Sequence, residues 1–278
     1  MSPHLVGAIE VHVLQDGVLT LPADVFPDLD PTRAEKAARQ AGQRHIHGEV
    51  KLPVNAFVVK TSQALVLVDA GSPNGWMDGV GNFPQSLAQS GFAPKDFTHV
   101  MLTHMHIDHV GGLIDADGAA VFTNAELVTG AGDWTFFFDD AVYARLAPDR
   151  KASMDACRRA VRPYVDRKRE VQGETPLVPG LTTLALPGHT PGHSGLMIED
   201  QGAELLIWGD VVHSEAYQLA EPDWGVAFDV DTNQARATRH ALLDRVATDR
   251  LPITGHHLQT PPFARVERAQ VGYRLVRY

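Results

Sequence analysis

The positions of apolar residues predict alternating strands and helices along the whole chain. Residues 8–17 alternate apolar with polar side chains and end in Asp-Gly, which predicts a strand followed by a turn. Residues 55–71 contain two β-branched runs separated by the polar stretch KTSQ, which predicts a hairpin. Further apolar runs predict strands at residues 97–104, 181–186, 194–200, 203–210 and 251–257 and at the C-terminal YRLVRY.

Helices are predicted between these strands by capping residues and by the spacing of apolar positions. Residues 30–42 begin with a capping Asp, continue with Pro and end in Gly. Helices are also expected at FPQSLAQSG, in most of residues 133–165 and at residues 231–249, where Asp231 is the expected N-cap. Each half of the chain is strand-rich first and helical later. This order predicts an α/β fold, an αββα four-layer sandwich that forms a single domain over residues 1–278.

Composition narrows the classes of protein that this chain can represent. Hydrophobic residues make up 44% and charged residues 21%, which is typical of a globular protein with a substantial core. The chain has 24 Lys plus Arg against 34 Asp plus Glu, and its net charge of −10 disfavours a nucleic-acid partner. Cys157 is the only cysteine, so neither an intramolecular disulfide nor a zinc site of several thiolates can form. Without a secretory signal or an apolar run of about 20 residues, we expect a soluble, cytoplasmic protein that binds no membrane.

Histidine and aspartate follow four of the predicted strands. A cluster of four stands after the strand at 97–102, and single positions or pairs follow three later strands. These residues are His104, His106, Asp108 and His109, then His189, then Asp210, then His256 and His257. A fold that gathers the four strand ends at one edge would place five imidazoles, counting one of the adjacent His256 and His257, and two carboxylates in one pocket.

These residue types predict a metal centre with two ions. Neutral imidazole and carboxylate suit zinc first, with Mn, Co, Fe or Ni as alternatives. Seven ligands exceed the four of a closed structural zinc site, which indicates two metals with open positions. A water shared by two such ions ionises near pH ~7, and the hydroxide would attack a carbonyl or phosphoryl centre. A side-chain nucleophile is not expected, because the chain has no G-x-S-x-G motif and Cys157 has no suggested partner.

The same motifs resemble those of a known family. HMHIDH resembles the HxHxDH signature of the metallo-β-lactamase fold superfamily, and LPGHTPGHS, WGD and TGHHL match its later metal motifs in order. Nearly the whole chain is similar to the branch of methyl parathion hydrolase and the dihydrocoumarin-type lactonases. The supporting stretches are AIEVHVLQDG, LPVNAFVV, ALVLVDAG, THMHIDHVGGL, PGHTPGHS, GDVVH and GHHLQTPP…GYRLVRY.

The resemblance implies a role for each motif residue. His104, His106 and His189 would hold one metal, and Asp108, His109 and a C-terminal histidine would hold the other, with Asp210 bridging them. In this branch the last ligand precedes Leu in an x-His-Leu-x-x-Pro context, which favours His257 over the alternative His256. Asp69 resembles an aspartate that supports the histidine loop, with a solvated strand-end Asp as the alternative. His193 is expected to brace its loop rather than to bind metal.

Catalytic and pocket residues are less sharply indicated. Asp108 first, and Asp210 second, would carry a proton to the leaving group. His213 stands where acyl-homoserine lactonases carry a Tyr that holds the substrate carbonyl; it would donate a hydrogen bond there or simply line the wall. Trp134 and Phe137 belong to an aromatic run that would roof an apolar pocket or, as the pattern favours, pack in the core.

The expected function is therefore that of a dinuclear metal-dependent hydrolase. A metal-bridging hydroxide would open a small apolar lactone or cleave an ester, and the alternative substrate is an organophosphate triester. An alternative from another class is a mononuclear iron oxidoreductase of the persulfide dioxygenase type, which metal analysis would distinguish. Related enzymes are often dimers, so a homodimer is the assembly that the resemblance suggests.

Overall fold

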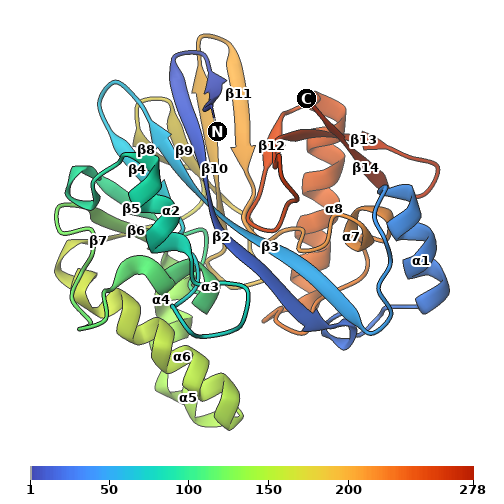
Figure 1. Ribbon diagram of the computed structural model, residues 1–278, viewed down its shortest axis with the longest axis horizontal. Helices are drawn as coiled ribbons and strands as arrows, with labels where there is room; N and C mark the ends of the chain where they lie inside the picture. The colour runs from blue at the N-terminus through green and yellow to red at the C-terminus, as the bar shows by residue number, and fades with distance from the viewer. Residues whose placement is uncertain (1) are drawn as a thin grey trace.

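Two seven-stranded sheets pack face to face and carry helices on both outer sides (Figure 1). The structure is a computed structural model that describes residues 2–278. The first sheet consists of β1 (His4–Val6), β2 (Ile9–Pro22), β3 (Glu49–Lys60), β4 (Leu65–Val68), β5 (His99–Met101), β6 (Glu126–Gly130) and β7 (Lys168–Val171). The second consists of β8 (Thr175–Val178), β9 (Leu181–Ala185), β10 (Ser194–Asp200), β11 (Ala203–Ile207), β12 (Ile253–Thr254), β13 (Ala264–Arg268) and β14 (Tyr273–Arg277). The predicted αββα sandwich is confirmed.

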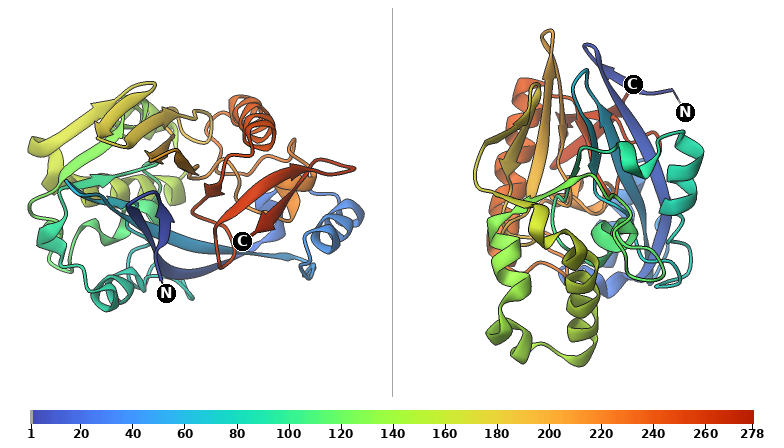
Figure 2. Two further views of the ribbon diagram at one scale, coloured as in Figure 1. Left: turned by 90° about the horizontal axis from the view of Figure 1, so that it is seen from above. Right: turned by 90° about the vertical axis from the view of Figure 1, so that its left-hand side faces the viewer.

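Helices cover the outer face of each sheet. The right-hand view of Figure 2 shows the two sheets nearly edge on, with α2 on one outer side and α8 on the other. The helices are α1 (Pro31–Gln40), α2 (Phe83–Ser90), α3 (Ile107–Val110), α4 (Ala131–Phe138), α5 (Asp140–Arg145), α6 (Pro148–Val161), α7 (Tyr217–Ala220) and α8 (Thr232–Asp249). In both sheets, strands that are neighbours in space are consecutive in the chain, so most strand pairs form between close segments.

The long strand β3 shows how the four layers are held together. Its side chains at Phe57 and Val59 enter the apolar core between the two sheets. Those at Ala56 and Val58 point the other way, into the core beneath α2 and α6. Because both faces of the sheet are covered, the central residues of the strand are all buried. Each fully buried large apolar side chain stabilises such a core by about 1.5–3 kcal/mol.

Several elements agree with the sequence pattern. The helix predicted at residues 30–42 is α1, and Asp30 caps it by accepting a hydrogen bond from the backbone N–H of Arg33 at 2.8 Å. The hairpin predicted at residues 55–71 is β3–β4. Gly91 ends α2 in the left-handed conformation, at φ 83°. Asp231 caps α8 through the N–H of Gln234.

The turn predicted at Asp16-Gly17 is wrong, because β2 continues through these residues to Pro22. The pairing of β2 with β3 shifts by one residue between Gln15 and Gly17, which makes this site a bulge. The Asp16 side chain is fully buried and accepts hydrogen bonds from the backbone N–H groups of Ser72, Gly81 and Phe83. In sequence alone, a continuous strand with a buried aspartate at a bulge therefore looks the same as a strand that ends in an Asp-Gly turn.

Among residues 2–278, no helix is both long enough and apolar enough to span a bilayer.

Candidate metal centre

Four loops that follow strands bring the predicted ligands to one edge of the two sheets. The loop after β5 and the short helix α3 supply His104, His106, Asp108 and His109 from the first sheet. The loops after β9, β11 and β12 supply the remaining positions from the second sheet. The atoms that could hold an ion form four overlapping groups, each with its atoms within 4.8 Å of one another. The groups are Asp108, His109, His256 and His257; His104, His106 and His189; His104, His109 and Asp210; and His189, Asp210 and His213.

The first cluster consists of three histidines. His104 Nε2 lies 3.0 Å from His106 Nδ1, which lies 2.9 Å from His189 Nε2. Asp210 Oδ2 lies 3.7 Å from His104 Nε2 and 3.6 Å from His189 Nε2. Three imidazole nitrogens and one carboxylate oxygen therefore surround one point, which suits a four-coordinate cation.

The second cluster lies on the other side of the same carboxylate. Asp210 Oδ2 is 3.3 Å from His109 Nε2 and 3.2 Å from His257 Nε2. Asp108 Oδ2 completes the group, 3.8 Å from His109 Nε2 and 3.6 Å from His257 Nε2. The Asp210 carboxylate is thus shared by both clusters.

His256 and His257 are both buried, but their rings are held differently. His257 Nδ1 donates a hydrogen bond to the carbonyl of Pro53 at 2.7 Å, which leaves Nε2 to face Asp210 and Asp108. His256 stacks on His109 with ring centroids 3.6 Å apart, and its Nε2 lies 3.8 Å from Asp108 Oδ2. The His257 nitrogen is therefore the nearer of the two to the shared carboxylate, and the choice of His257 as ligand stays a prediction.

Asp69 and His193 lie behind the clusters. Asp69 accepts hydrogen bonds from the N–H and hydroxyl of Thr103, and its Oδ2 is 3.0 Å from His109 Nδ1. It adopts a left-handed backbone at φ 61°, which turns β4 sharply into this contact. His193 donates through Nδ1 to the carbonyl of Leu186 and accepts the Asp210 N–H at Nε2. Both side chains thus hold residues of the predicted ligand set in place.

Two further buried aspartates were missed by the sequence reasoning. Asp229 Oδ1 accepts a hydrogen bond from His189 Nδ1 at 2.8 Å, and its side chain is fully buried. Asp133, in α4, accepts the N–H of Met105 and the N–H of Gly192, so it links the two loops that carry the three-histidine cluster. Burial raises the pKa of Asp133 to about 6. In the sequence, each of these aspartates is a single carboxylate within a mostly apolar segment, GAGDWTF or VAFDV, and this pattern could have indicated a buried aspartate.

The electrostatics of the centre favour neutral histidines in the first cluster. Burial lowers the pKa of His104, His106 and His189 well below the ordinary value, so each ring offers a lone pair. Burial also opposes charge on His109, but the carboxylates of Asp210, Asp69 and Asp108 outweigh it and raise the pKa of His109 well above the ordinary value. The carboxylates of the second cluster therefore favour a positive charge close to His109.

The donor atoms of the centre fit metal ions. In the described chain, His109 Nε2, Asp210 Oδ1 and both ring nitrogens of His213 and of His256 are buried without a hydrogen-bond partner. Each buried polar atom without a partner lowers the stability of the folded protein by about 1–3 kcal/mol. So many such atoms in one place indicate a missing partner that binds their lone pairs. Divalent cations have that property.

A cavity of about 580 Å³ opens onto both clusters. Its floor includes His106, Asp108, His189, Asp210, His213 and His257. Its apolar walls include Leu19, Leu21, Leu52, Trp76, Met77 and Phe228, and α6 contributes polar residues that include Arg150 and Arg159. His213 Nε2 reaches to 3.2 Å from Asp210 Oδ2, so this side chain lies at the floor rather than on the wall.

Neither Trp134 nor Phe137 belongs to the lining of this cavity. Trp134 stacks on Phe138 with ring centroids 4.5 Å apart, and Lys168 Nζ lies 4.4 Å from the centroid of the Trp134 ring. Phe137 is buried and packs its ring edge against His106 at 6.0 Å between centroids. Both aromatic residues pack in or against the core beneath the first sheet, which is the alternative that the sequence pattern favoured.

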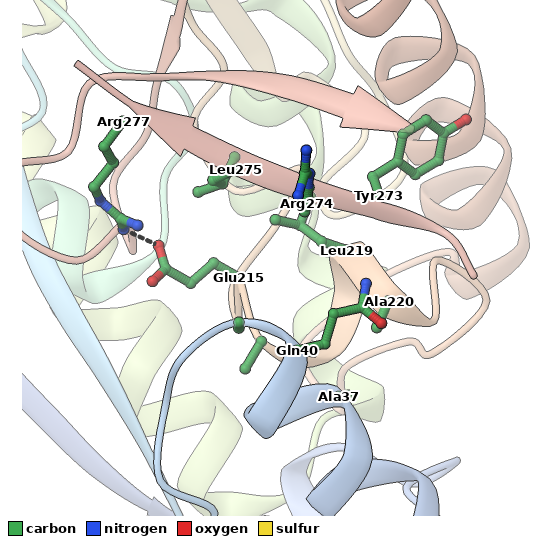
Figure 3. A pocket seen from close by; sticks show the side chains of 11 residues that line it. Ala37, Gln40, Glu215, Leu219, Ala220, Tyr273, Arg274, Leu275 and Arg277 are labelled. Atoms are coloured by element: carbon green, nitrogen blue, oxygen red, sulfur yellow. Dashed lines mark hydrogen bonds and ion pairs between the residues drawn. The ribbon is translucent and has the colours of Figure 1, made fainter. Parts of the chain in front are cut away.

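A smaller cavity of about 170 Å³ lies between α1, α7 and β14. Figure 3 shows its charged groups, with the Arg277 guanidinium turned toward Glu215, to which it donates a hydrogen bond. Glu215 also accepts a hydrogen bond from the backbone N–H of Gln259. The pair joins the last strand to the segment that follows Asp210, and no candidate metal cluster of the described residues includes it.

Comparisons with known proteins agree with this fold. A family model described as the metallo-beta-lactamase superfamily matches residues 50–256. N-acyl homoserine lactonase of Bacillus thuringiensis is 26% identical over 186 residues, which cover 60% of this chain and 66% of the relative. The chain thus spans slightly less than two thirds of that lactonase. Metallo-beta-lactamase domain-containing protein 1 of Xenopus laevis is 30% identical over 207 residues, covering 74% of this chain and 70% of the relative.

Solved structures extend the match over the whole chain. Hydrolase AbOPH of the beta lactamase superfamily aligns with a TM-score of 0.90 at 25% identity, covering 100% of this chain and 97% of that chain. AidC, a dizinc quorum-quenching lactonase in complex with a product, also aligns with a TM-score of 0.90 and the same coverage, at 22% identity. The likeness to AidC shows the shared fold.

Proposed function

The chain belongs to the metallo-β-lactamase superfamily, and from that membership and its paired clusters we propose that it is a dinuclear metal-dependent hydrolase. The observation that carries this proposal is the single carboxylate oxygen of Asp210 that lies within 4 Å of nitrogens from both clusters. A tetrahedral zinc site takes four ligands, and here the donor atoms continue on the far side of Asp210. Zinc is the metal that this mixture of imidazole and carboxylate favours.

In the proposed centre each cluster holds one ion. His104, His106 and His189 bind the first. Asp108, His109 and His257 bind the second, and Asp210 contacts both. Two zinc ions bound there would supply a hydroxide nucleophile near neutral pH and would polarise the substrate carbonyl.

The side chains around the ions position the substrate and move the proton. Asp108 faces the cavity and retains some solvent exposure, so its carboxylate can accept the proton that the attacking nucleophile gives up and pass it to the alkoxide that leaves when a lactone ring opens. His213 lies beside Asp210 with no hydrogen-bond partner for either ring nitrogen in the described chain, so it can donate to a substrate oxygen. The buried floor limits access of bulk water, which strengthens both interactions.

We further propose a small lactone or ester with an apolar substituent as the substrate. The walls formed by Leu19, Leu21, Leu52, Trp76 and Phe228 would bury such a substituent, at about 25 cal/mol for each Å² removed from water. The curated relative from Bacillus thuringiensis is a lactonase, which supports the same substrate class. We also propose that, within the superfamily, the chain belongs to the branch of methyl parathion hydrolase and dihydrocoumarin-type lactonases, which its sequence motifs resemble; the His213 that stands where acyl-homoserine lactonases carry Tyr supports a substrate other than a homoserine lactone.

A substrate panel with metal analysis of the same preparation tests the proposal. Lactones, aryl esters and phosphotriesters are compared, and we expect about two zinc ions per chain with the highest kcat/KM for an apolar lactone. The Asp210→Ala variant is treated with a chelator and reloaded with zinc, and Asp117→Ala, a surface substitution, is treated in the same way as the control. We expect Asp210→Ala to lose at least one ion and nearly all hydrolysis. One iron per chain together with oxygen consumption would overturn the proposal, as would an Asp210→Ala variant with unchanged activity.

A further inference from the structure

A buried arginine lies behind the metal centre. Arg239 projects from α8 and is only 1% exposed. Burial lowers its pKa to about 10, so the guanidinium stays charged at neutral pH. Burying a charge destabilises the folded protein unless the charge is fully hydrogen-bonded. The hydrogen-bond partners of Arg239 therefore indicate which part of the structure it stabilises.

The guanidinium donates to three backbone carbonyls of the segment that follows β11. Nε donates to the carbonyl of Val211 at 2.8 Å. Nη1 donates to the carbonyls of Pro222 at 2.8 Å and Trp224 at 3.1 Å. Apart from the single turn of α7, this segment has no regular secondary structure between Trp208 and Val230 to fix its backbone. Arg239 supplies the missing donors, and its contact with Val211 lies one residue from Asp210.

The third nitrogen of the Arg239 guanidinium lies near Asp229, the aspartate that is hydrogen-bonded to His189. Nη2 lies 4.0 Å from Asp229 Oδ2, and Asp229 Oδ1 accepts the Nδ1 hydrogen of His189 at 2.8 Å. Because Asp229 accepts the Nδ1 hydrogen of His189, the Nε2 nitrogen of that ring is left to face an ion, and Arg239 lies where it can hold the Asp229 carboxylate in this position. Thr238, the preceding residue of α8, also donates its hydroxyl to the carbonyl of Pro187, near His189.

We propose that Arg239 is a positioning residue for the dinuclear centre, acting on Asp210 through Val211 and on His189 through Asp229. Its planar fork of donors suits this double role, because an ammonium group cannot reach divergent carbonyls and a carboxylate together. The inference rests on the proposed function, since it concerns the affinity of the same centre for zinc. It assigns part of that affinity to a helix residue that contacts no ligand side chain directly.

Zinc affinity, measured by competition with a chromophoric chelator, tests the role of Arg239 without relying on turnover. We expect Arg239→Met to weaken binding at the three-histidine cluster by about 10–100-fold, which is typical when the group that orients a metal-binding histidine is lost. Arg239→Lys keeps a cation near Asp229 but loses the fork, and we expect an intermediate loss. Arg245→Met is the matched control, because Arg245 is an exposed arginine of the same helix whose contact is Asp249.

Two further readouts separate positioning from general loss of stability. In cobalt-substituted protein, the visible absorption bands should shift in the Arg239 variants and stay unchanged in Arg245→Met. In a double-mutant cycle, Asp229→Asn and Arg239→Met should have less than additive effects on zinc affinity, because both act on His189.

The outcomes distinguish this inference from the proposed function. If wild-type protein binds two zinc ions and both Arg239 variants match it within twofold, the inference is overturned and the proposed function stands. If wild-type protein binds fewer than two ions, the proposed function itself fails. If Arg239→Met does not fold, the Lys variant decides, and wild-type zinc affinity and cobalt bands in that variant overturn the inference.

Discussion

Replacing Asp16 with Asn tests how the wall of the cavity above the candidate metal centre is held in place. The Asp16 carboxylate is buried at the β2 bulge and accepts backbone hydrogen bonds from Ser72 at 3.1 Å, from Gly81 at 3.1 Å and from Phe83 at 2.7 Å. These donors begin and end the segment 72–83, which carries cavity residues from Pro73 to Met77. The substitution keeps the shape of the side chain and removes one acceptor oxygen.

The expected cost follows from the bonds that Asn cannot make. Its remaining oxygen can still accept from Phe83, but its NH₂ group meets the N–H of Ser72, and two donors then face each other. Losing one hydrogen bond to a charged group costs about 1.5–3 kcal/mol, and the unsatisfied buried N–H adds to it, so we expect about 3 kcal/mol in total. For a chain of this length that corresponds to a fall in Tm of about 6–12 °C.

Urea denaturation of the metal-loaded protein measures this change, with Asp78→Asn as the control. Asp78 lies in the same segment but is exposed. Because the wall would shift while the ligands remain, we also expect KM to rise more than kcat falls. An Asp16→Asn variant whose unfolding free energy equals that of the control would refute the reasoning, because the carboxylate would then not be holding the segment.

Three further predictions concern single residues. His257→Ala should lose zinc from the second cluster while His256→Ala retains more of it, as measured by metal analysis after dialysis; the reverse order would make His256 the ligand. Cys157 should not react with a thiol reagent in the native protein and should react fully in urea, because burial first and Asp108 second raise the pKa of its thiol; rapid native labelling would contradict this. Asp30→Ala should lower the unfolding free energy by about 1 kcal/mol through loss of the α1 cap while kcat/KM is unchanged; Asp30→Asn is the control, and equal stability of the two variants would count against the cap.

The fold, and the gathering of the predicted ligands at one edge of the sheets, were predictable from the sequence because their causes are local. Runs of apolar residues define β3, β4 and β10, and the histidines stand in the segments that follow strands, so strand ends that meet at one edge of the sheets bring them together. The bulge at Asp16 was misinterpreted because its reason lies about 60 residues away, at the N–H groups that the carboxylate binds.

The supporting groups of the centre were not predictable for the same physical reason. Asp229 and Arg239 act on His189 and Asp210 from 40 and 29 residues away along the chain, and neither belongs to a motif with fixed spacing. Their role appears only once α8 packs against the second sheet. Trp134 and Phe137 show the opposite problem, because an aromatic run indicates burial without indicating which cavity or core receives it.

The floor and the walls of the cavity come from different parts of the chain. The floor residues lie in segments that follow strands of the sandwich, including the short helix α3, whereas the walls come from the far ends of β2 and β3, from segment 73–77, from α6 and from Phe228. Mutations in the walls can therefore accumulate without disturbing the ions. Natural selection, or a directed-evolution experiment, can change which molecules are accepted while the reaction itself is inherited unaltered. Substrate range in such a protein can thus diverge much faster than its chemistry.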